Sequence, residues 1–243
     1  MVAANDVANS AAASNQEREH LLEVAAQRLN PSLRDPNYLV LRARRLIFEK
    51  WIQGLGSNLS ILDIGGRYQP YRPLFEGRIA RYVAVDIDAT NLVDVVGNGE
   101  ALPFVPNGFD VVISTQVFDY IPRPHAAAAE ALSVLRPGGV LLMSVPAFAP
   151  RFRDEELWRY LPGGIRSILA DFSDVSIVPE ISSAGGMVRT LNVGLSSLAG
   201  NALRPIFNWT VCPLLNLLGQ LAESARLTRN DQFTPNYSVL ARK

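Results

Sequence analysis

The sequence is short of the residues that build disulfides and metal centres. Cys212 is the only cysteine among 243 residues, which excludes an internal disulfide and a cysteine-rich metal site. His20 and His125 are the only histidines, so a histidine-based zinc site is not favoured either and no metal is expected. A single cysteine fits a reducing, cytoplasmic setting.

The chain also lacks an excess of either charge. Lys+Arg and Asp+Glu both number 23, so the formal net charge is +0. We therefore expect no nucleic-acid partner, although a local basic patch remains open. Residues 1–14 lack the positive start and apolar core of a signal peptide. Residues 1–16, rich in Ala, Asn and Ser, are predicted to form a disordered tail.

What the chain does contain is enough apolar material for one α/β domain with additions, since 48% of it is hydrophobic. Residues 17–57 are predicted to form N-terminal helices, at 17–29 and 38–55. Strand-like apolar runs and helical stretches alternate after them, and near-continuous apolar strands separated by helices favour a parallel sheet covered on both faces. The expected strands are 59–64, 82–86, 109–114 and 140–145, with a helix at 125–135 and two late strands at 174–178 and 237–241.

Residues 58–243 are expected to form the main domain, with 147–232 carrying substrate-side or lid insertions. Within them, residues 191–221 contain a single charged residue, Arg204. Two prolines and four asparagines argue against a membrane span. Helices of a lid buried over the sheet are one interpretation, and an apolar surface that contacts a membrane or an apolar substrate is the other.

The stretch ILDIGGRYQPYRPLF, residues 61–75, looks like a strand that runs into a nucleotide-binding turn. Gly65 and Gly66 let the backbone turn tightly and approach a ligand. A dinucleotide fingerprint would also need glycine at positions 67 and 70, where the chain has Arg67 and Pro70. The pattern therefore disfavours a nucleotide-dependent oxidoreductase.

A ligand without phosphates needs an acid and a close backbone instead. Asp63 supplies the acid beside the two glycines. Asp86 ends the second predicted strand, 23 residues after Asp63, close to the spacing of a ribose-binding acid. Its two oxygens can accept from both ribose hydroxyls.

Four blocks of sequence carry a family resemblance. They are ILDIGGR, YVAVDID, GNGEALPFVPNGFDVVIS and AAAAEALSVLRPGGVLLMSVP, and they span about residues 59–146. In this order they resemble the class I S-adenosylmethionine-dependent methyltransferases, in particular the methyltransferase type 11-like group that acts on small molecules, lipids and glycans. The resemblance implies a Rossmann-like, doubly wound seven-stranded sheet. It would be mostly parallel with an antiparallel closing strand, and would carry N-terminal helices and a helical lid.

The resemblance also implies a cofactor, S-adenosylmethionine, and the residues that would bind it. Asp63, Gly65 and Gly66 would hold its methionine part, and Asp86 its ribose. The adenine would lie near the remaining positions, which are Ile87, Asn98, Gly99, Glu100 and Ala101. Gln116, just past the strand at 109–114, would line the sulfonium pocket.

The sequence departs from the family pattern at three places. Arg67 stands where a third glycine is usual, so its side chain must point away from the cofactor or fold over it. Asn98 stands where relatives often carry an acid. Asp119 and Tyr120 stand where many relatives have a Glu-His pair, which leaves the catalytic role open.

The function that the resemblance implies is methyl transfer, by in-line displacement, to a small-molecule, lipid or glycan acceptor. The alternative is a non-catalytic, methyltransferase-like binding or regulatory module. A general base is needed only if the acceptor must lose a proton, and the candidates are Tyr120, His125 and Asp119. Trp158 and Tyr160 either pack a lid or line the acceptor pocket. Residues 191–221 favour a lipid-linked or apolar acceptor and peripheral membrane contact.

Overall fold

The computed structural model describes the backbone of residues 2–243 and the side chains of residues 14–243. Within that range seven strands form one sheet, in the order β3-β2-β1-β4-β5-β7-β6. The strands are β1 (Leu59–Ile64), β2 (Ile79–Asp86), β3 (Val95–Val96), β4 (Phe109–Thr115), β5 (Leu135–Pro146), β6 (Asp174–Pro179) and β7 (Asn236–Arg242).

The sheet has the predicted direction pattern. Every pairing among β1 to β5 is parallel, whereas β7 runs antiparallel to both β5 and β6. The predicted Rossmann-like, mostly parallel sheet with one antiparallel strand is therefore confirmed. The strand order reverses between β1 and β4, which is the place where open α/β sheets bind ligands.

Pairing lengthens two strands beyond their predicted starts. β2 begins at Ile79, opposite Leu59, and β5 begins at Leu135, opposite Phe109. Residues 136–139, between the predicted helix and the predicted strand, therefore lie inside β5, where Gly138 has φ +78°. The partner strands supply these extra hydrogen bonds, so the local sequence could not reveal them.

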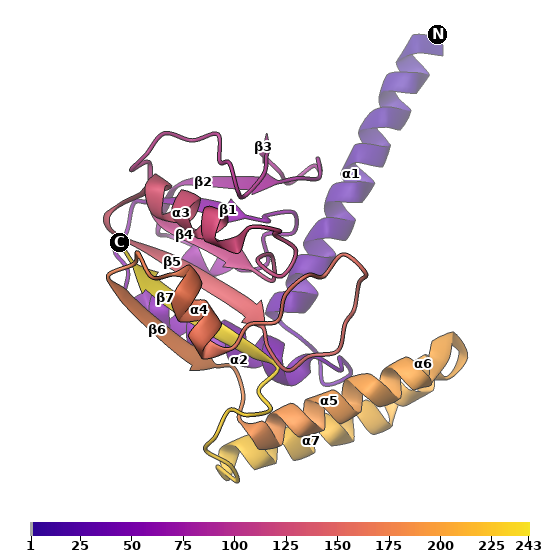
Figure 1. Cartoon of the computed structure of the whole chain (residues 1–243). Coiled ribbons are helices and arrows are strands. Elements are labelled where there is room, and N and C mark those ends of the chain that lie inside the picture. Colours follow the sequence, from indigo (N-terminus) through magenta and orange to yellow (C-terminus); the bar gives the residue numbers. More distant parts are fainter. Residues whose placement is uncertain (1) are drawn as a thin grey trace.

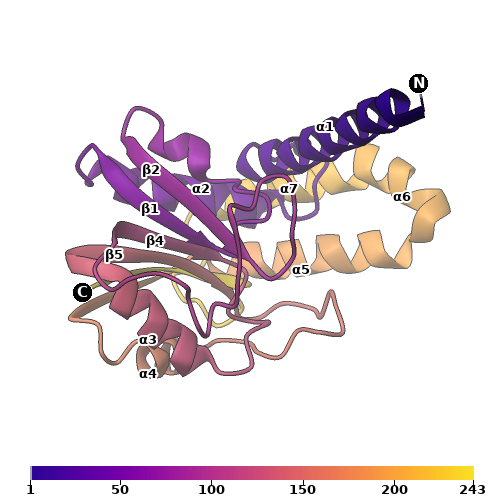
Figure 2. The ribbon, with the colours of Figure 1, turned by 90° about the horizontal axis from the view of Figure 1, so that it is seen from above.

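Helices cover both faces of the sheet (Figure 2). On one face lie α3 (Pro124–Val134) and α4 (Pro162–Ile168), and on the other lie α2 (Tyr38–Gln53) and the 3₁₀ turn η1 (Arg72–Phe75). Coverage on both sides explains why the central strands read as almost continuous apolar runs.

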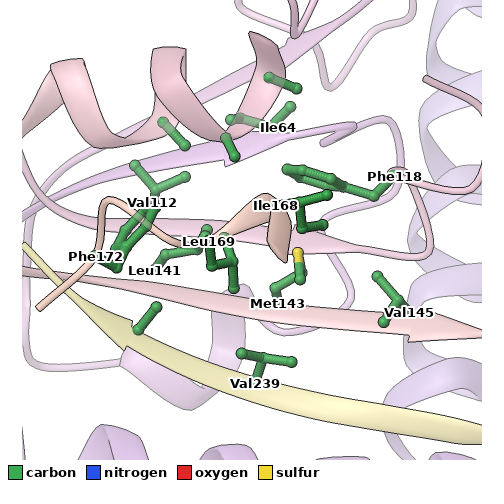
Figure 3. Packing of buried hydrophobic residues seen from close by; sticks show 14 of the residues in the cluster. Ile64, Val112, Phe118, Leu141, Met143, Val145, Ile168, Leu169, Phe172 and Val239 are labelled. Atoms are coloured by element: carbon green, nitrogen blue, oxygen red, sulfur yellow. The ribbon is translucent and has the colours of Figure 1, made fainter. Parts of the chain in front are cut away.

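Each face carries its own buried apolar cluster. On the α4 side, Phe118, Leu141 and Met143 gather with Ile168 (Figure 3). On the α2 side, Phe48 and Ile52 pack with Ile61 of β1 and Leu142 of β5. These clusters fix the carboxyl ends of β1, β2 and β4 relative to one another.

The first helix is longer than predicted. α1 runs over Val2–Leu29, whereas residues 1–16 are predicted from the sequence to form a disordered tail. Alanine-rich sequence favours helix, and the first part of α1 extends away from the sheet (Figure 1). Its second half joins the body, where Asn91 donates to Ser14 and Glu17 and Leu21, Ala25 and Leu29 are buried.

Residues 183–224 form a helical arm that projects beyond the sheet (Figure 1). It consists of α5 (Ser183–Leu198), α6 (Gly200–Trp209) and α7 (Val211–Ser224). The interpretation of residues 191–221 as helices buried over the sheet is wrong, because most large apolar side chains of the arm are exposed. The arm packs mainly on itself and, through α7, on α2.

Candidate functional site

The candidate cofactor residues meet at the carboxyl edge of the sheet. Asp63 is the penultimate residue of β1, and its register partners are Ala84 on β2 and Ile113 on β4. Asp86 ends β2, and Gln116 follows β4 directly. Because parallel strands end at the same edge, three segments that are far apart in sequence lie side by side there.

The glycine turn after β1 is shaped by close contacts. Gly65 has φ +76°, and its N–H donates to the Val85 carbonyl at 2.8 Å, as does that of Gly66 at 3.2 Å. A Cβ on Gly65 would collide with the Val117 side chain, and one on Gly66 would stand 2.8 Å from the Ala84 Cβ. Both positions therefore require glycine, as the sequence suggested.

Asp63 is a buried acid with one side-chain donor. It is 5% exposed, and the Tyr82 hydroxyl donates to its Oδ2 at 2.6 Å. Burial raises the pKa of Asp63 to about 7; Asp86 adds to the rise, while Tyr82 and Arg72 oppose it. Near neutral pH this carboxyl can therefore either accept or donate a proton in a hydrogen bond.

Asp86 is held by the backbone and keeps free acceptor capacity. Its Oδ2 accepts from the Arg67 N–H at 3.2 Å and its Oδ1 from the Asp88 N–H at 3.0 Å. Each oxygen has a second lone pair, and the side chain is half-buried. The Arg67 guanidinium turns to Asp88 Oδ2, 2.8 Å away, and so lies along the loop after β2.

Of the positions expected near the adenine, Ile87 is exposed, whereas Asn98 to Ala101 form a closed turn. Ile87 is 71% exposed beside Asp86, so its side chain is available to a ligand. Asn98 Oδ1 accepts the Glu100 N–H at 2.9 Å and so holds its own turn, which is closed by a bridge between Asn98 and Ala101. Gly99 lies over Ile64, since a Cβ there would stand 3.3 Å from the Ile64 Cγ2.

Glu100 makes structural contacts instead of facing the open edge. Its Oε1 accepts the Arg123 N–H at 2.6 Å, and its Oε2 accepts from Arg123 Nη2 at 3.0 Å. These hydrogen bonds lower the pKa of Glu100. The carboxylate therefore ties the adenine-side loop to the start of α3.

Gln116 leads into a buried polar chain that sequence reasoning missed. It has φ +56°, and its Nε2 donates to Ser144 Oγ at 3.0 Å. Ser144 Oγ donates in turn to Glu180 Oε1 at 2.7 Å, and Glu180 forms a two-point ion pair with Arg44, at 2.7 and 3.0 Å. No local pattern signals this chain, because Arg44 and Glu180 are 136 positions apart.

Asp119 lies in a buried environment that brings its pKa closer to physiological pH. It is 4% exposed, and its Oδ1 has no hydrogen-bond partner among the described residues. Burial raises its pKa to about 6, and Glu156 adds to the rise.

The other two base candidates lie in different surroundings. The Tyr120 hydroxyl donates to Glu156 Oε1 at 3.4 Å, and burial raises its pKa to about 12. His125 is exposed at the start of α3 and lines a cleft of about 660 Å³ with Trp158, Tyr160 and residues of α4. Neither Asp63 nor Asp86 lines that cleft, so His125 is not grouped with the cofactor residues.

Residues 147–161, named the Phe152 loop below, cover the Asp119 side. Glu156 organises the loop by accepting the Phe152 N–H at 3.2 Å and by pairing with Arg159. The Asp119 carbonyl accepts the Leu157 N–H at 2.7 Å, which ties the loop down.

Trp158 and Tyr160 of the loop lie in different surroundings. Tyr160 is 5% exposed, and its hydroxyl donates to the Phe118 carbonyl at 2.8 Å, so it belongs to the core. Trp158 is half-exposed in the His125 cleft.

Comparison with known proteins gives the same family as the sequence blocks. Residues 62–143 match the family described as a methyltransferase domain. A relative from Mycolicibacterium paratuberculosis, described as an uncharacterized methyltransferase, is 27% identical over 192 residues, which cover 68% of this chain and 75% of the relative.

Two solved structures share the fold. A SAM-dependent methyltransferase from Archaeoglobus fulgidus matches with a TM-score of 0.52 at 17% identity, over 86% of this chain and 95% of its own. A cyclase matches with a TM-score of 0.53 at 17% identity, over 81% of this chain and 80% of its own. At such identities the two likenesses establish the fold alone.

Proposed function

This chain carries a class I S-adenosylmethionine-dependent methyltransferase domain, and we propose that it binds S-adenosylmethionine at the carboxyl edge of β1 and β2 and methylates a small-molecule, lipid or glycan acceptor. One observation carries the proposal. A buried acid, a glycine turn and a second acid with free lone pairs converge there, in Asp63, Gly65, Gly66 and Asp86. A cytoplasmic location belongs to the same proposal and rests on the lone cysteine.

The residues at this edge fit the chemistry of such a cofactor. Asp63 would hold its amino-acid end, and the glycine turn leaves the backbone within reach. Asp86 would accept from ribose hydroxyls through the lone pairs that the Arg67 and Asp88 N–H groups leave free. The exposed side chain of Ile87 would pack on the adenine.

S-adenosylmethionine supplies a methyl group already activated by a positively charged sulfur, so the protein's task is alignment and exclusion of water. Well-oriented reactants can gain roughly 7–11 kcal/mol of barrier reduction from alignment alone. If the acceptor is a hydroxyl, a base must also take its proton. We assign that role to Asp119, because its Oδ1 is unpartnered and its pKa of about 6 leaves it ionised at neutral pH.

Cofactor binding is the first test, by calorimetric titration of S-adenosylmethionine into the whole chain. We expect binding by the wild type and at least tenfold weaker binding by Asp86→Ala, because a ribose partner is lost. Asp88→Ala is the matched control: Asp88 is exposed and pairs with Arg67, so its loss should change affinity by less than about threefold. Binding of NAD in place of S-adenosylmethionine would contradict the proposal, and unchanged affinity in Asp86→Ala would remove Asp86 from the site.

The helical arm supports an apolar or lipid-linked acceptor. The seam between α5 and α7 is small and polar: Gly185, Asn192 and Asn216 are buried, and Asn192 Nδ2 donates to Asn216 Oδ1 at 3.1 Å. The outer surface of the arm carries the large apolar side chains, which are Met187, Leu191, Leu198, Leu203, Ile206, Trp209, Leu214, Leu217, Leu218 and Leu221.

Small and polar residues in the seam with leucines outside are typical of helices that pack in lipid. No helix in the described part of the chain is long and apolar enough to cross a membrane. We therefore propose that the arm lies along a lipid surface and brings the acceptor side to it.

Vesicle flotation tests the arm. The wild type should float with phosphatidylcholine vesicles, and a variant with Leu198→Glu, Trp209→Glu and Leu214→Glu should stay in the soluble fraction. Val105→Glu, at an equally exposed position outside the arm, should float like the wild type. A wild type that stays soluble and forms a dimer, which the triple variant breaks, would instead make the arm an interface between two copies.

A further inference from the structure

Arg189, on α5, is a buried cation whose donors are largely unused. It is 3% exposed, and its Nη2 donates to Asn37 Oδ1 at 2.6 Å. Its Nε and Nη1 are buried without a hydrogen-bond partner among the described residues. Burying a charge is costly unless the charge is paired and hydrogen-bonded. Asn37 and the Phe152 ring are the partners described for this guanidinium, and they leave two of its nitrogens without a hydrogen-bond acceptor.

The nearby acids do not pair with Arg189. In the part of the chain with described side chains, no carboxylate lies within ion-pair distance of it. Glu180 is already saturated, since its Oε1 accepts from Arg44, Ser144 and Ser238 and its Oε2 from Arg44. Asp35 accepts the Asn37 N–H, and burial raises its pKa, which weakens it as a counter-charge.

The electrostatic balance around Arg189 is that of an uncompensated cation. Burial lowers its pKa to about 10, and Arg44 lowers it further, while Glu180 and Asp35 only partly oppose this. At neutral pH the guanidinium is still charged.

The Phe152 ring lies over this side chain and also borders a hollow that Arg189 itself does not line. The Phe152 ring centroid is 5.6 Å from the Arg189 Cζ. Phe152 also lines a cavity of about 390 Å³, together with Arg151, Arg153, Asp154 and Glu155. A pocket of this size admits a small ligand or the head of a larger one.

The Phe152 loop links Arg189 to the candidate base. The Phe152 loop is tied to Asp119 through the Leu157 N–H. The buried chain from Gln116 through Ser144 and Glu180 ends at Arg44, whose charge acts on Arg189. A group held by Arg189 would therefore lie on the same side as the candidate base.

We propose that Arg189, beneath the Phe152 loop, binds an anionic group of the acceptor, a carboxylate or a phosphate. A guanidinium offers two parallel N–H donors that match either group. That the anion belongs to the methyl acceptor rests on the proposed function; the anion site itself does not.

Anion binding and stability together test the proposal on the whole chain. Inorganic phosphate and citrate are titrated at constant ionic strength, and the melting temperature is followed. We expect a saturable rise for the wild type, at least tenfold weaker binding for Arg189→Gln and partial retention for Arg189→Lys. Arg166→Gln, which removes an exposed arginine of α4, should bind like the wild type.

The stability of the free variants separates a binding role from a structural one. Without added anion, Arg189→Gln should melt no lower than the wild type, because it removes a desolvated charge that nothing pairs. A lower melting temperature in the free variant, or equal anion binding in wild type and variant, would overturn the proposal. A parallel titration with S-adenosylmethionine distinguishes the anion-site proposal from the methyl-transfer proposal. If the wild type binds phosphate but not the cofactor, the anion site is supported and the methyl-transfer proposal is contradicted.

Vesicles distinguish the two sources of a phosphate. If the anion is a lipid headgroup, phosphatidic acid should increase flotation over phosphatidylcholine alone, and Arg189→Gln should abolish that increase. If the anion is carried by a small molecule, flotation should not depend on Arg189 while phosphate or citrate binding does.

Discussion

At the scale of single residues, Asp119 shows how burial sets chemistry. Its sequence context, a Phe-Asp-Tyr after a strand, does not distinguish a base from a loop acid. Burial with one unpartnered oxygen raises the pKa of Asp119 from 3.8 to about 6, which places its titration just below neutral pH, where a general base is effective.

Asp119→Asn should therefore change stability and activity in opposite directions. The folded pKa is raised, so the folded state of the wild type loses stability as pH rises from about 4 to 6, while the unfolded state ionises first. At pH 7 the variant should be more stable by up to about 3 kcal/mol, and at pH 4 the difference should vanish. Thermal melts at both pH values measure this; a variant less stable at pH 7 would contradict it.

If Asp119 is the base, the rate of S-adenosylhomocysteine release with a responsive acceptor should rise with pH through about 6 in the wild type. The same rate should fall by roughly 10²–10⁴-fold in Asp119→Asn. An unchanged rate would remove Asp119 from catalysis and leave it as a buried structural acid.

At the scale of elements, one ion pair joins α2 to the sheet. Burial alone would lower the pKa of Arg44, but the Glu180 carboxylate holds it above its ordinary value. Glu180 also accepts hydrogen bonds from the hydroxyls of Ser144 on β5 and Ser238 on β7. The pair therefore fixes α2 against β7 and against β5, whose end carries the Phe152 loop.

Arg44→Met should destabilise the fold by about 3–5 kcal/mol, because it leaves Glu180 buried without its counter-charge. The double variant Arg44→Met with Glu180→Gln should recover a substantial part of that loss, since a neutral amide is cheaper to bury. Chemical unfolding of the two variants measures the difference. A double variant as unstable as the single one would show that packing, and not the unpaired charge, accounts for the loss.

The arm depends on a second kind of contact between elements. A Cβ on Gly219 of α7 would collide with Leu39 of α2, so the helices meet at a glycine. Because the helices pack closely through small residues, the large leucine side chains of α7 face away from the contact. An apolar sequence therefore forms an exposed arm here and not a buried lid.

At the scale of the whole molecule, the last strand in sequence is an inner strand of the sheet, next to the edge strand β6. β7 lies between β5 and β6 and pairs with both. The C-terminal end of the chain therefore supports the face on which Glu180 and Ser144 lie.

Deleting residues 236–243 should abolish folding, because it exposes two strand edges and opens the buried cluster on the α4 side. Deleting residues 2–12, which precede the contacts of Asn91 with Ser14 and Glu17, should change the melting temperature by no more than a few degrees. Solubility and circular dichroism compare the two. A folded C-terminal deletion would show that β6 and β7 form a separable unit.

The parts of this protein that could be predicted from the sequence are those that local chemistry specifies. Apolar runs set the parallel strands, since both faces are covered, and glycine at 65 and 66 was required by a turn with positive φ and by close contact. The acids at 63 and 86 could be predicted for the same reason: each ends or nearly ends a strand, and parallel strands end at one edge.

Contacts between residues far apart in the chain could not be predicted in this way, because they form only in the folded protein. In the folded chain Glu100 pairs with Arg123, and His125 lies in a separate cleft. Arg44 pairs with Glu180, whereas Arg189 is buried without a carboxylate partner among the described residues. The leucines of residues 191–221 also turn outward. Burial and pairing of side chains are properties of the packed chain, and no local pattern contains them.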